Sequence, residues 1–344
     1  MRILPLVVVI LLPGATGQAD EVVLIPGTTL KQAIGGRVRG QIQSESPTEV
    51  VVKLGATTTV VPVDQIVSIR YDGQPATLQL AESRESGGQL QEAAELYRKA
   101  AAEAGGKPLV VQEALFREAT VLAQLALVEP DRLKDAIERL SLFVQSHPAS
   151  RHIVSARENL ARLNIEAGNF SAASTALDEL AKLPHGGERA AVLRARLQSA
   201  QGDHSAAIKE LERVMPTLSD RSAARRGALL LKAECLVNLK RFPEAEELIR
   251  GVIRDSQPED AESQAPAYNM LGDCLRAAGK TKDALLAYLH TDLLYSQNKQ
   301  EHPRAMHHLQ RLFRQLNQDS RAEEYAQRLR QEYPRSPWLN ASRD

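Results

Sequence analysis

The sequence predicts a mainly α-helical chain of stacked helical hairpins, preceded by one small all-β domain. Small residues recur at nearly regular intervals from about residue 76 to the C-terminus, as they do where paired helices cross closely. Residues 20–73 instead hold short β-branched runs separated by turn residues, which favours strands. The first 19 residues are largely apolar and differ from both parts.

The N-terminal segment 1–19 has the composition of a secretory signal peptide. Arg2 provides a positive start, residues 3–12 are apolar, and Gly17-Gln18-Ala19 offers small residues for cleavage. We expect cleavage after Ala19 and export to the periplasm or cell envelope. The alternative is a buried N-terminal strand. The apolar run is too short to span a bilayer, and we expect no transmembrane segment in the mature chain.

The β domain is expected over residues 20–73 and contains five predicted strands. They are predicted at residues 22–25, 37–43, 49–54, 57–61 and 66–71. Because a flat sheet of this size cannot bury both of its faces, we expect the five strands to curl into a small barrel. The order G-R-V-x-G-x-I, V-V-x-L and V-P-V-D-Q-I-x-x-I resembles the Sm-like or SH3-like small barrels. Sm proteins bind RNA partly through an I-R-G-like turn, but Tyr71 follows Ile69-Arg70 here, so RNA binding is not carried over.

Residues 74–344 carry a repeated pattern of one alanine followed four residues later, in most copies, by a large apolar residue. The alanines lie 34 to 43 residues apart and are Ala93, Ala136, Ala173, Ala207, Ala245, Ala284 and Ala322. Five residues before four of them stands a glycine, suited to the turn inside a hairpin: Gly88, Gly168, Gly202 and Gly279. This spacing predicts six to seven helical hairpins.

Each first helix should carry a small residue twelve positions before its alanine, where the two helices cross. Such residues are Ala81, Ala161, Ala195, Ala233 and Gly272. The second and seventh hairpins depart from this pattern, because Gln124 and Gln310 occupy the place. A register shift of one residue, to Ala123, restores the second hairpin.

The segment from Tyr268 to Tyr288 resembles the tetratricopeptide (TPR) repeat. The consensus is W-x-x-L-G-x-x-Y followed by A-x-x-x-F, and here Leu271-Gly272 and Ala284 match while Tyr268 and Tyr288 keep aromatic rings. The resemblance implies a TPR α-solenoid over residues 74–344. The endings at residues 143–150 and 329–336 are similar to those of TPR proteins of the bacterial envelope.

Composition and motifs argue against several function classes. The 43 Lys and Arg residues balance 43 Asp and Glu residues, so a clustered basic surface for nucleic acid is not expected. We find no nucleophile elbow, phosphate-binding glycine loop or C-x-x-C pair. The consecutive His307 and His308 lack the i, i+4 spacing of a helical metal site. We therefore expect no enzyme activity, catalytic residue, metal or cofactor.

A TPR array presents a concave groove lined by the first helix of each hairpin. Groove positions lie three residues before, one after and four after the small residue. The candidate partner-binding residues are Glu158, Arg162, Arg196, Glu234, Asn269, Asp273 and Arg276. The expected function is an exported, non-catalytic scaffold that binds a partner peptide or protein. The alternative is that the β-barrel binds a ligand or nucleic acid and the array supports it.

The two cysteines, Cys235 and Cys274, occupy equivalent places in neighbouring repeats. An exported protein could join them in a disulfide. We favour two free, buried thiols, because equivalent first helices usually lie too far apart for a bridge.

Overall fold

A computed structural model describes residues 19–220, 222–339 and 341. Of the predicted signal peptide only Ala19 falls within these residues, so the rest of that prediction lies outside the described residues. The chain divides into two compact units between Pro75 and Ala76, close to the boundary expected after residue 73. Each unit is described by itself below.

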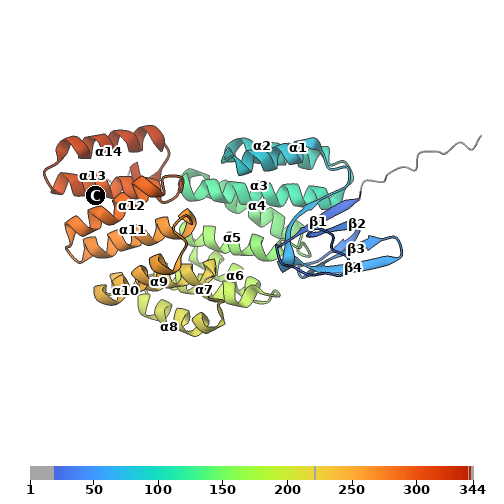
Figure 1. The fold of residues 1–344 in the computed structure, drawn as a ribbon, viewed down its shortest axis with the longest axis horizontal. Coiled ribbons are helices and arrows are strands. Elements are labelled where there is room, and N and C mark those ends of the chain that lie inside the picture. The colour runs from blue at the N-terminus through green and yellow to red at the C-terminus, as the bar shows by residue number, and fades with distance from the viewer. Residues whose placement is uncertain (1–18, 221, 340, 342–344) are drawn as a thin grey trace, which may run out of the picture. The chain divides into compact units, whose positions relative to one another are not determined.

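The first unit is a five-stranded antiparallel sheet (Figure 1). The strands are β1 (Asp20–Leu24), β2 (Arg37–Glu45), β3 (Glu49–Leu54), β4 (Thr57–Pro62) and β5 (Ile66–Arg70), with a 3₁₀ turn, η1 (Val63–Gln65), before β5. Their order across the sheet is β4-β3-β2-β1-β5. The strands expected from sequence are therefore all present, each within a few residues of its predicted ends.

The sheet is curved at Gly40, in the middle of β2. The first half of β2 pairs with β1 and the second half pairs with β3. A Cβ atom at Gly40 would lie 2.5 Å from the carbonyl oxygen of Lys53, so only glycine allows this approach. Val22, Val50 and Val61 are fully buried in the core of the unit. Since β4 and β5 are the two ends of the described strand order, closure into a barrel stays a prediction.

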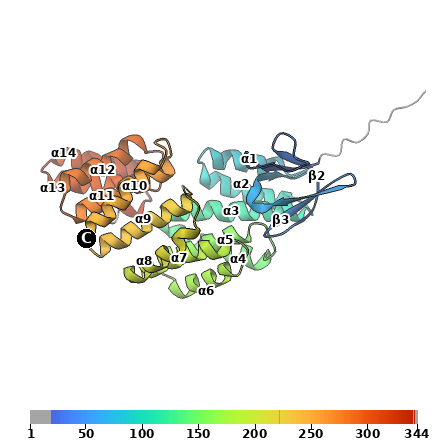
Figure 2. The ribbon, with the colours of Figure 1, turned by 60° about the horizontal axis from the view of Figure 1, so that its bottom comes forward.

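The second unit consists of helices paired as consecutive hairpins (Figures 1 and 2). The described helices are α1 (Ala76–Ser86), α2 (Leu90–Glu103), α3 (Pro108–Val128), α4 (Leu133–Ser146), α5 (Ile153–Glu166), α6 (Phe170–Ala181), α7 (Gly186–Ala200), α8 (His204–Val214), α9 (Ala223–Asn238), α10 (Phe242–Asp255), α11 (Ala261–Ala277), α12 (Thr281–Leu294), α13 (His302–Gln315) and α14 (Asp319–Glu332). Three 3₁₀ turns, η2 (Pro130–Arg132), η3 (Met215–Thr217) and η4 (Pro337–Leu339), lie between or after them. The mainly α-helical prediction is confirmed.

The recurring small residues lie where the helices of each hairpin cross. All seven alanines of the ladder, from Ala93 to Ala322, are 0% exposed. At Gly272 an added Cβ would come within 2.6 Å of the Tyr288 ring, so α11 and α12 can approach this closely only over a glycine. In the second hairpin Ala123 is buried and Gln124 is exposed, which confirms the shifted register.

The turns inside the hairpins place one residue in the left-handed region. The four glycines expected there have φ between 73° and 87°. Two hairpins use another residue at the same place, Lys240 with φ 62° and Asn317 with φ 57°. A lysine in this conformation brings its Cβ close to the backbone, whereas asparagine tolerates it better.

Replacing Lys240 with glycine should therefore stabilise the protein. We expect the free energy of unfolding to rise by about 0.5–1 kcal/mol, because relief of strain exceeds the entropy lost through a more flexible unfolded chain. Urea unfolding followed by circular dichroism measures the change. Asn317→Gly is the matched control and should give a smaller gain. A loss of stability in Lys240→Gly would contradict the strained turn.

A buried polar cluster joins the last two hairpins around Asp292 of α12. Its carboxylate accepts hydrogen bonds from His302 Nε2 at 2.8 Å, from the Tyr325 hydroxyl at 2.7 Å and from Arg328 at 3.1 Å. The Tyr333 hydroxyl lies 2.7 Å from His302 Nδ1. Burial on its own would raise the pKa of Asp292, but these partners lower it to about 2.

Low pH should weaken this contact between the last two hairpins. A carboxyl whose pKa is lower in the folded state stabilises that state above its unfolded pKa and loses the effect as pH falls through the folded pKa. We expect about 2 kcal/mol of stability to be lost between about pH 4 and pH 2. Asp292→Asn should remove this part of the acid sensitivity in urea titrations at several pH values, whereas Asp178→Asn, at an exposed site, should not. Equal acid sensitivity in Asp292→Asn and the wild type would contradict the assignment.

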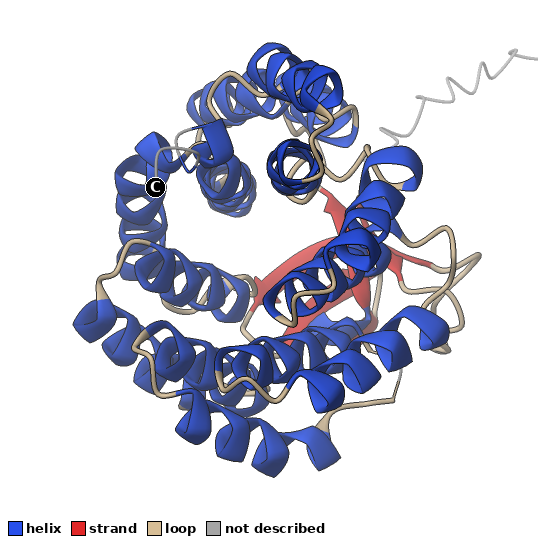
Figure 3. Ribbon diagram, turned by 90° about the vertical axis from the view of Figure 1, so that its left-hand side faces the viewer, coloured by secondary structure: helices blue, strands red, loops and turns tan. Residues whose placement is uncertain are grey.

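Two further features of the second unit concern its cysteines and its ends. Cys235 and Cys274 are buried and free, as favoured from sequence. Arg335, after α14, forms an ion pair at 3.1 Å with Glu129, between α3 and α4. The last hairpin thus reaches the second, and Figure 3 shows the helices following one another around a curve.

Among the described residues, no helix combines the length and apolar character needed to cross a membrane.

Candidate partner-binding cleft

A cleft of about 570 Å³ opens among the last three hairpins, and we call it the C-terminal cleft. Most of its lining comes from the first helices α9, α11 and α13, as predicted for the groove of the array. The lining residues are Glu234, Val237, Asn238, Lys240, Phe242, Met270, Asp273, Arg276, Ala277, Arg304, His308 and Trp338. It therefore combines apolar, aromatic and charged side chains.

Helical spacing explains why α11 contributes several of these residues. Met270, Asp273 and Arg276 follow one another every three residues, so they share one face of the helix. Gly272 lies beside this face, against the ring of Tyr288. The close packing of Tyr288 over Gly272 also places its hydroxyl on Asp273, in the wall of the cleft.

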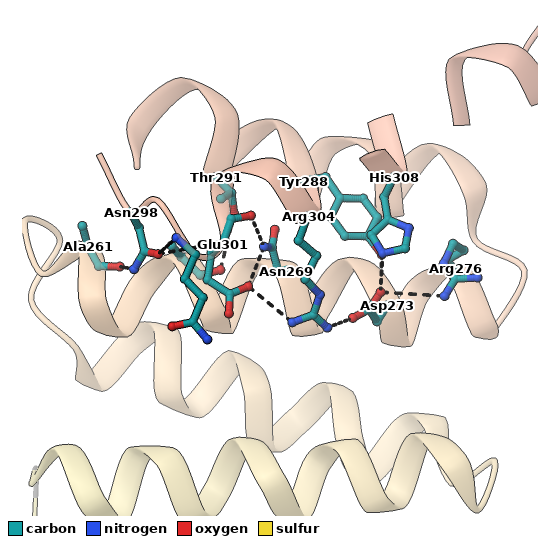
Figure 4. A network of polar contacts seen from close by, with 12 residues as sticks. Ala261, Asn269, Asp273, Arg276, Tyr288, Thr291, Asn298, Glu301, Arg304 and His308 are labelled. Carbon is teal, nitrogen blue, oxygen red and sulfur yellow. Dashed lines mark hydrogen bonds and ion pairs between the residues drawn. The ribbon is translucent and has the colours of Figure 1, made fainter. Parts of the chain in front are cut away.

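Asp273 is the electrostatic centre of the cleft wall (Figure 4). Its carboxylate pairs with the Arg304 guanidinium and accepts a hydrogen bond from the Tyr288 hydroxyl at 2.6 Å. His308 Nε2 lies 3.5 Å and the Arg276 guanidinium 3.8 Å from the same carboxylate. Burial alone would raise the pKa of Asp273, but Arg304 and the other donors hold it below its ordinary value. Asp273 is therefore ionised at neutral pH.

Aromatic contacts fix the side of the cleft made by α13 and η4. The His308 ring stacks on Tyr288 with ring centroids 4.8 Å apart and lies 5.5 Å from the Trp338 ring. The Arg304 guanidinium lies over Trp338 at 5.9 Å. Burial lowers the pKa of His308 to about 3, so its imidazole is neutral at pH 7.

The charges left available in the C-terminal cleft are those of Arg276, Lys240 and Glu234. Arg276 is 48% exposed, and its guanidinium lies 3.8 Å from the Asp273 carboxylate. Within the described part of the chain, Lys240 and Glu234 have no ion-pair partner. The cleft thus presents two cationic groups and one carboxylate to a binding partner, beside the apolar side chains of Phe242 and Met270.

Asn269, predicted as a groove residue, is fully buried instead. Its Nδ2 donates to the backbone carbonyl of Glu301 at 2.9 Å and to the Glu301 carboxylate at 2.8 Å. Asn298 in turn accepts from the backbone N–H of Glu301 at 3.0 Å (Figure 4). These amides join α11 to the start of α13, so in this structure Asn269 holds two repeats together and does not face solvent.

The other predicted groove residues lie earlier in the array, on α5 and α7, and do not line the C-terminal cleft. Glu158 accepts a hydrogen bond from Arg189 at 2.6 Å. Arg162 donates to Asn159 at 3.0 Å, and Arg196 lies 4.0 Å from Glu166. Of the seven candidates, the cleft brings together Glu234, Asp273 and Arg276.

Sequence reasoning missed Arg304, His308 and Trp338. Gln310 breaks the small-residue pattern in the seventh hairpin, so counting from that pattern gave no groove position on α13. The available signal was the i, i+4 spacing of Arg304 and His308 on one helix face, combined with the only tryptophan of the chain. In the described residues, no group of three or more His, Cys, Asp or Glu side chains could hold a metal ion.

Comparison with solved structures identifies the helical architecture. A tetratricopeptide repeat protein from Parabacteroides merdae superposes with a TM-score of 0.53 at 15% sequence identity, over 78% of this chain and 98% of that chain. The second unit has the fold of a TPR array. No protein-family model and no curated protein sequence matches the chain.

Two other solved structures are similar to the TPR array over a smaller share of the chain. PilW, described as a type IV pilus biogenesis factor, gives a TM-score of 0.46 at 15% identity over 67% of this chain and 98% of that chain. Pseudomonas aeruginosa pilF gives 0.42 at 15% identity over 67% and 96%. At these identities only the fold is shared, so the function has to be argued from the cleft.

Proposed function

We propose that the protein is a non-catalytic interaction scaffold and that its C-terminal cleft binds a segment of another protein. The observation that carries this proposal is the composition of the cleft. Arg276, Lys240 and Glu234 keep charges to offer, while Phe242 and Met270 supply apolar contact area. Such a combination suits a peptide, whose side chains and backbone present both kinds of group.

The wall of the cleft is held in place before a partner arrives. Asp273 is tied to Arg304, Tyr288 and His308, and Asn269 is tied to Glu301. Ordering these side chains costs nothing further at the moment of binding, which favours affinity. The scaffold proposal extends to the rest of the predicted groove, at Glu158, Arg162 and Arg196.

The proposal also places the protein outside the cytoplasm, in the cell envelope. Residues 1–19 support this, because they have the charge, apolar run and small residues of a signal peptide. For the first unit we propose a small Sm-like or SH3-like barrel. The continuous strand order and the bend of β2 at Gly40 support that curvature.

Quantitative affinity capture from native envelope extracts tests the proposed function. The chain from Asp20 onward serves as bait, alone or with Arg276→Glu and Glu234→Arg together. We expect at least one protein to be enriched by the wild type and lost with the double variant. Lys282→Glu, at an exposed residue of α12 outside the cleft, is the matched control and should keep it.

The same capture experiment shows whether the partner contacts the earlier part of the groove as well as the C-terminal cleft. Arg162→Glu or Arg196→Glu should weaken capture only if the partner extends along α5 and α7. If charge reversal at the cleft and at these positions leaves every captured protein unchanged, the groove does not bind the partner and the proposed function fails.

A further inference from the structure

Two hairpin tips of the first unit expose large aliphatic side chains. Ile34 is 85% exposed and Leu54 is 60% exposed. Ile34 opens a two-residue turn, in which its N–H donates to the Arg37 carbonyl at 2.9 Å and its carbonyl accepts from the Arg37 N–H at 3.2 Å. Leu54 ends β3 and faces Thr57 across the next tight turn. Both tips are therefore set by backbone geometry.

The glycines at these tips adopt the conformations that tight hairpin turns need. Gly35 and Gly36, with φ 59° and 73°, have the left-handed conformations of a type I′ hairpin turn, and Gly55 has φ 59°. Ile34 and Leu54 line one shallow hollow of about 350 Å³, together with Gln32, Gly35, Arg37 and Arg39. Two apolar side chains from separate turns thus lie at one place on the surface. We call it the aliphatic tip.

Two arginines line the aliphatic tip, and two lysines lie next to its residues in the chain. Arg37 and Arg39 line the hollow, Lys31 precedes Gln32 in the chain, and Lys53 precedes Leu54. The two arginines share one carboxylate, that of Glu21, at 3.3 Å and 2.6 Å, and remain 51% and 66% exposed. Within the described residues, neither lysine has an ion-pair partner. Two exposed arginines at the hollow thus share one carboxylate, and a lysine precedes each of the lining residues Gln32 and Leu54.

The opposite end of the β2–β3 hairpin is acidic. Glu45 ends β2 and Glu49 begins β3, whereas Arg37 begins β2 and Lys53 lies next to the end of β3. Because the strands are antiparallel, positive charge gathers at the aliphatic tip and negative charge at the other end. An anionic surface would therefore attract the first unit in the orientation that brings its aliphatic tip toward that surface.

We propose that the aliphatic tip binds an anionic lipid surface. Ile34 and Leu54 would enter the boundary between headgroups and acyl chains, while Lys31, Lys53 and the two arginines contact lipid phosphates. A protein partner is less favoured, because no aromatic anchor is among the side chains that line the hollow. The proposal does not depend on the C-terminal cleft.

Vesicle flotation tests the proposal with the chain from Asp20 onward, which carries both units and lacks the apolar run at residues 3–12. The vesicles are phosphatidylcholine alone or phosphatidylcholine with about one third phosphatidylglycerol. We expect binding to the mixed vesicles and much weaker binding to phosphatidylcholine alone. Ile34→Ser with Leu54→Ser should reduce the binding constant by about tenfold or more.

Val60→Ser with Val67→Ser is the matched control. These valines are also exposed, at 47% and 55%, but do not line the hollow. The control should bind like the wild type, and Lys31→Gln with Lys53→Gln should lose the preference for phosphatidylglycerol. Circular dichroism checks that each variant keeps its fold.

Four outcomes would overturn the proposal. The wild type could ignore both kinds of vesicle, the valine control could lose as much binding as the tip variant, or the two vesicle types could bind equally. Capture of an acidic protein through Ile34 and Leu54, without vesicle binding, would also overturn it and assign the tip to a protein partner. Arg276→Glu in the cleft should leave vesicle binding unchanged.

Discussion

Glu113→Ala is expected to lower the free energy of unfolding by about 3–5 kcal/mol. Glu113 of α3 is 3% exposed, and its carboxylate accepts hydrogen bonds from Arg117 at 3.0 Å and His152 at 2.7 Å and pairs with Arg151. Burial alone would raise the pKa of Glu113, but Arg151 and His152 hold it well below its ordinary value. Without the carboxylate, the buried guanidinium of Arg151 has lost its principal counter-ion.

Urea unfolding of the wild type and the variant measures this loss. Glu247→Ala, at an exposed position of α10, is the control and should change stability by less than about 0.5 kcal/mol. The chain from α3 to the start of α5 should also exchange amide hydrogens faster in Glu113→Ala. Equal stability of the two variants would show that Glu113 does not stabilise the contact between the second and third hairpins.

Asp273→Ala should cost about 3 kcal/mol of unfolding free energy. The variant would leave Arg304 without its main counter-ion and the Tyr288 hydroxyl without its acceptor. Because Arg304 stacks over Trp338, its displacement should also alter the emission of this single tryptophan. The effect therefore reports on the cleft wall as well as on stability.

A double-mutant cycle with Arg304→Met separates the ion pair from general damage. The double variant should be more stable than the sum of the two single losses predicts, by about 1–3 kcal/mol, because neither charge is then left alone. Additive losses would mean that Asp273 and Arg304 do not stabilise each other in the folded protein.

The helical part of the fold could be predicted because its rule is local. Ala93 to Ala322 lie at crossing points that every hairpin must have, and all are buried. Glu234, Asp273 and Arg276, which line the C-terminal cleft, could be selected by counting from the small residue of their own helix. Each of these predictions needs only helical periodicity within one repeat.

The rest depends on contacts between repeats. Asn269 turned inward because Glu301, 32 residues later, accepts its hydrogen bonds. Asp292, His302 and Tyr325 meet across three helices, and no spacing within one helix indicates that. Ile34 is exposed because it opens a tight turn, where the alternation that buries strand residues no longer applies.

Site-specific photo-crosslinking tests most directly whether the C-terminal cleft receives another protein. A photoreactive residue at Ala277, inside the cleft, is compared in cells with the same residue at Ala172, an exposed alanine of α6. We expect one defined protein adduct from position 277, lost with Arg276→Glu, and none from position 172. Adducts of equal yield and identity from both positions, or none from 277, would contradict it.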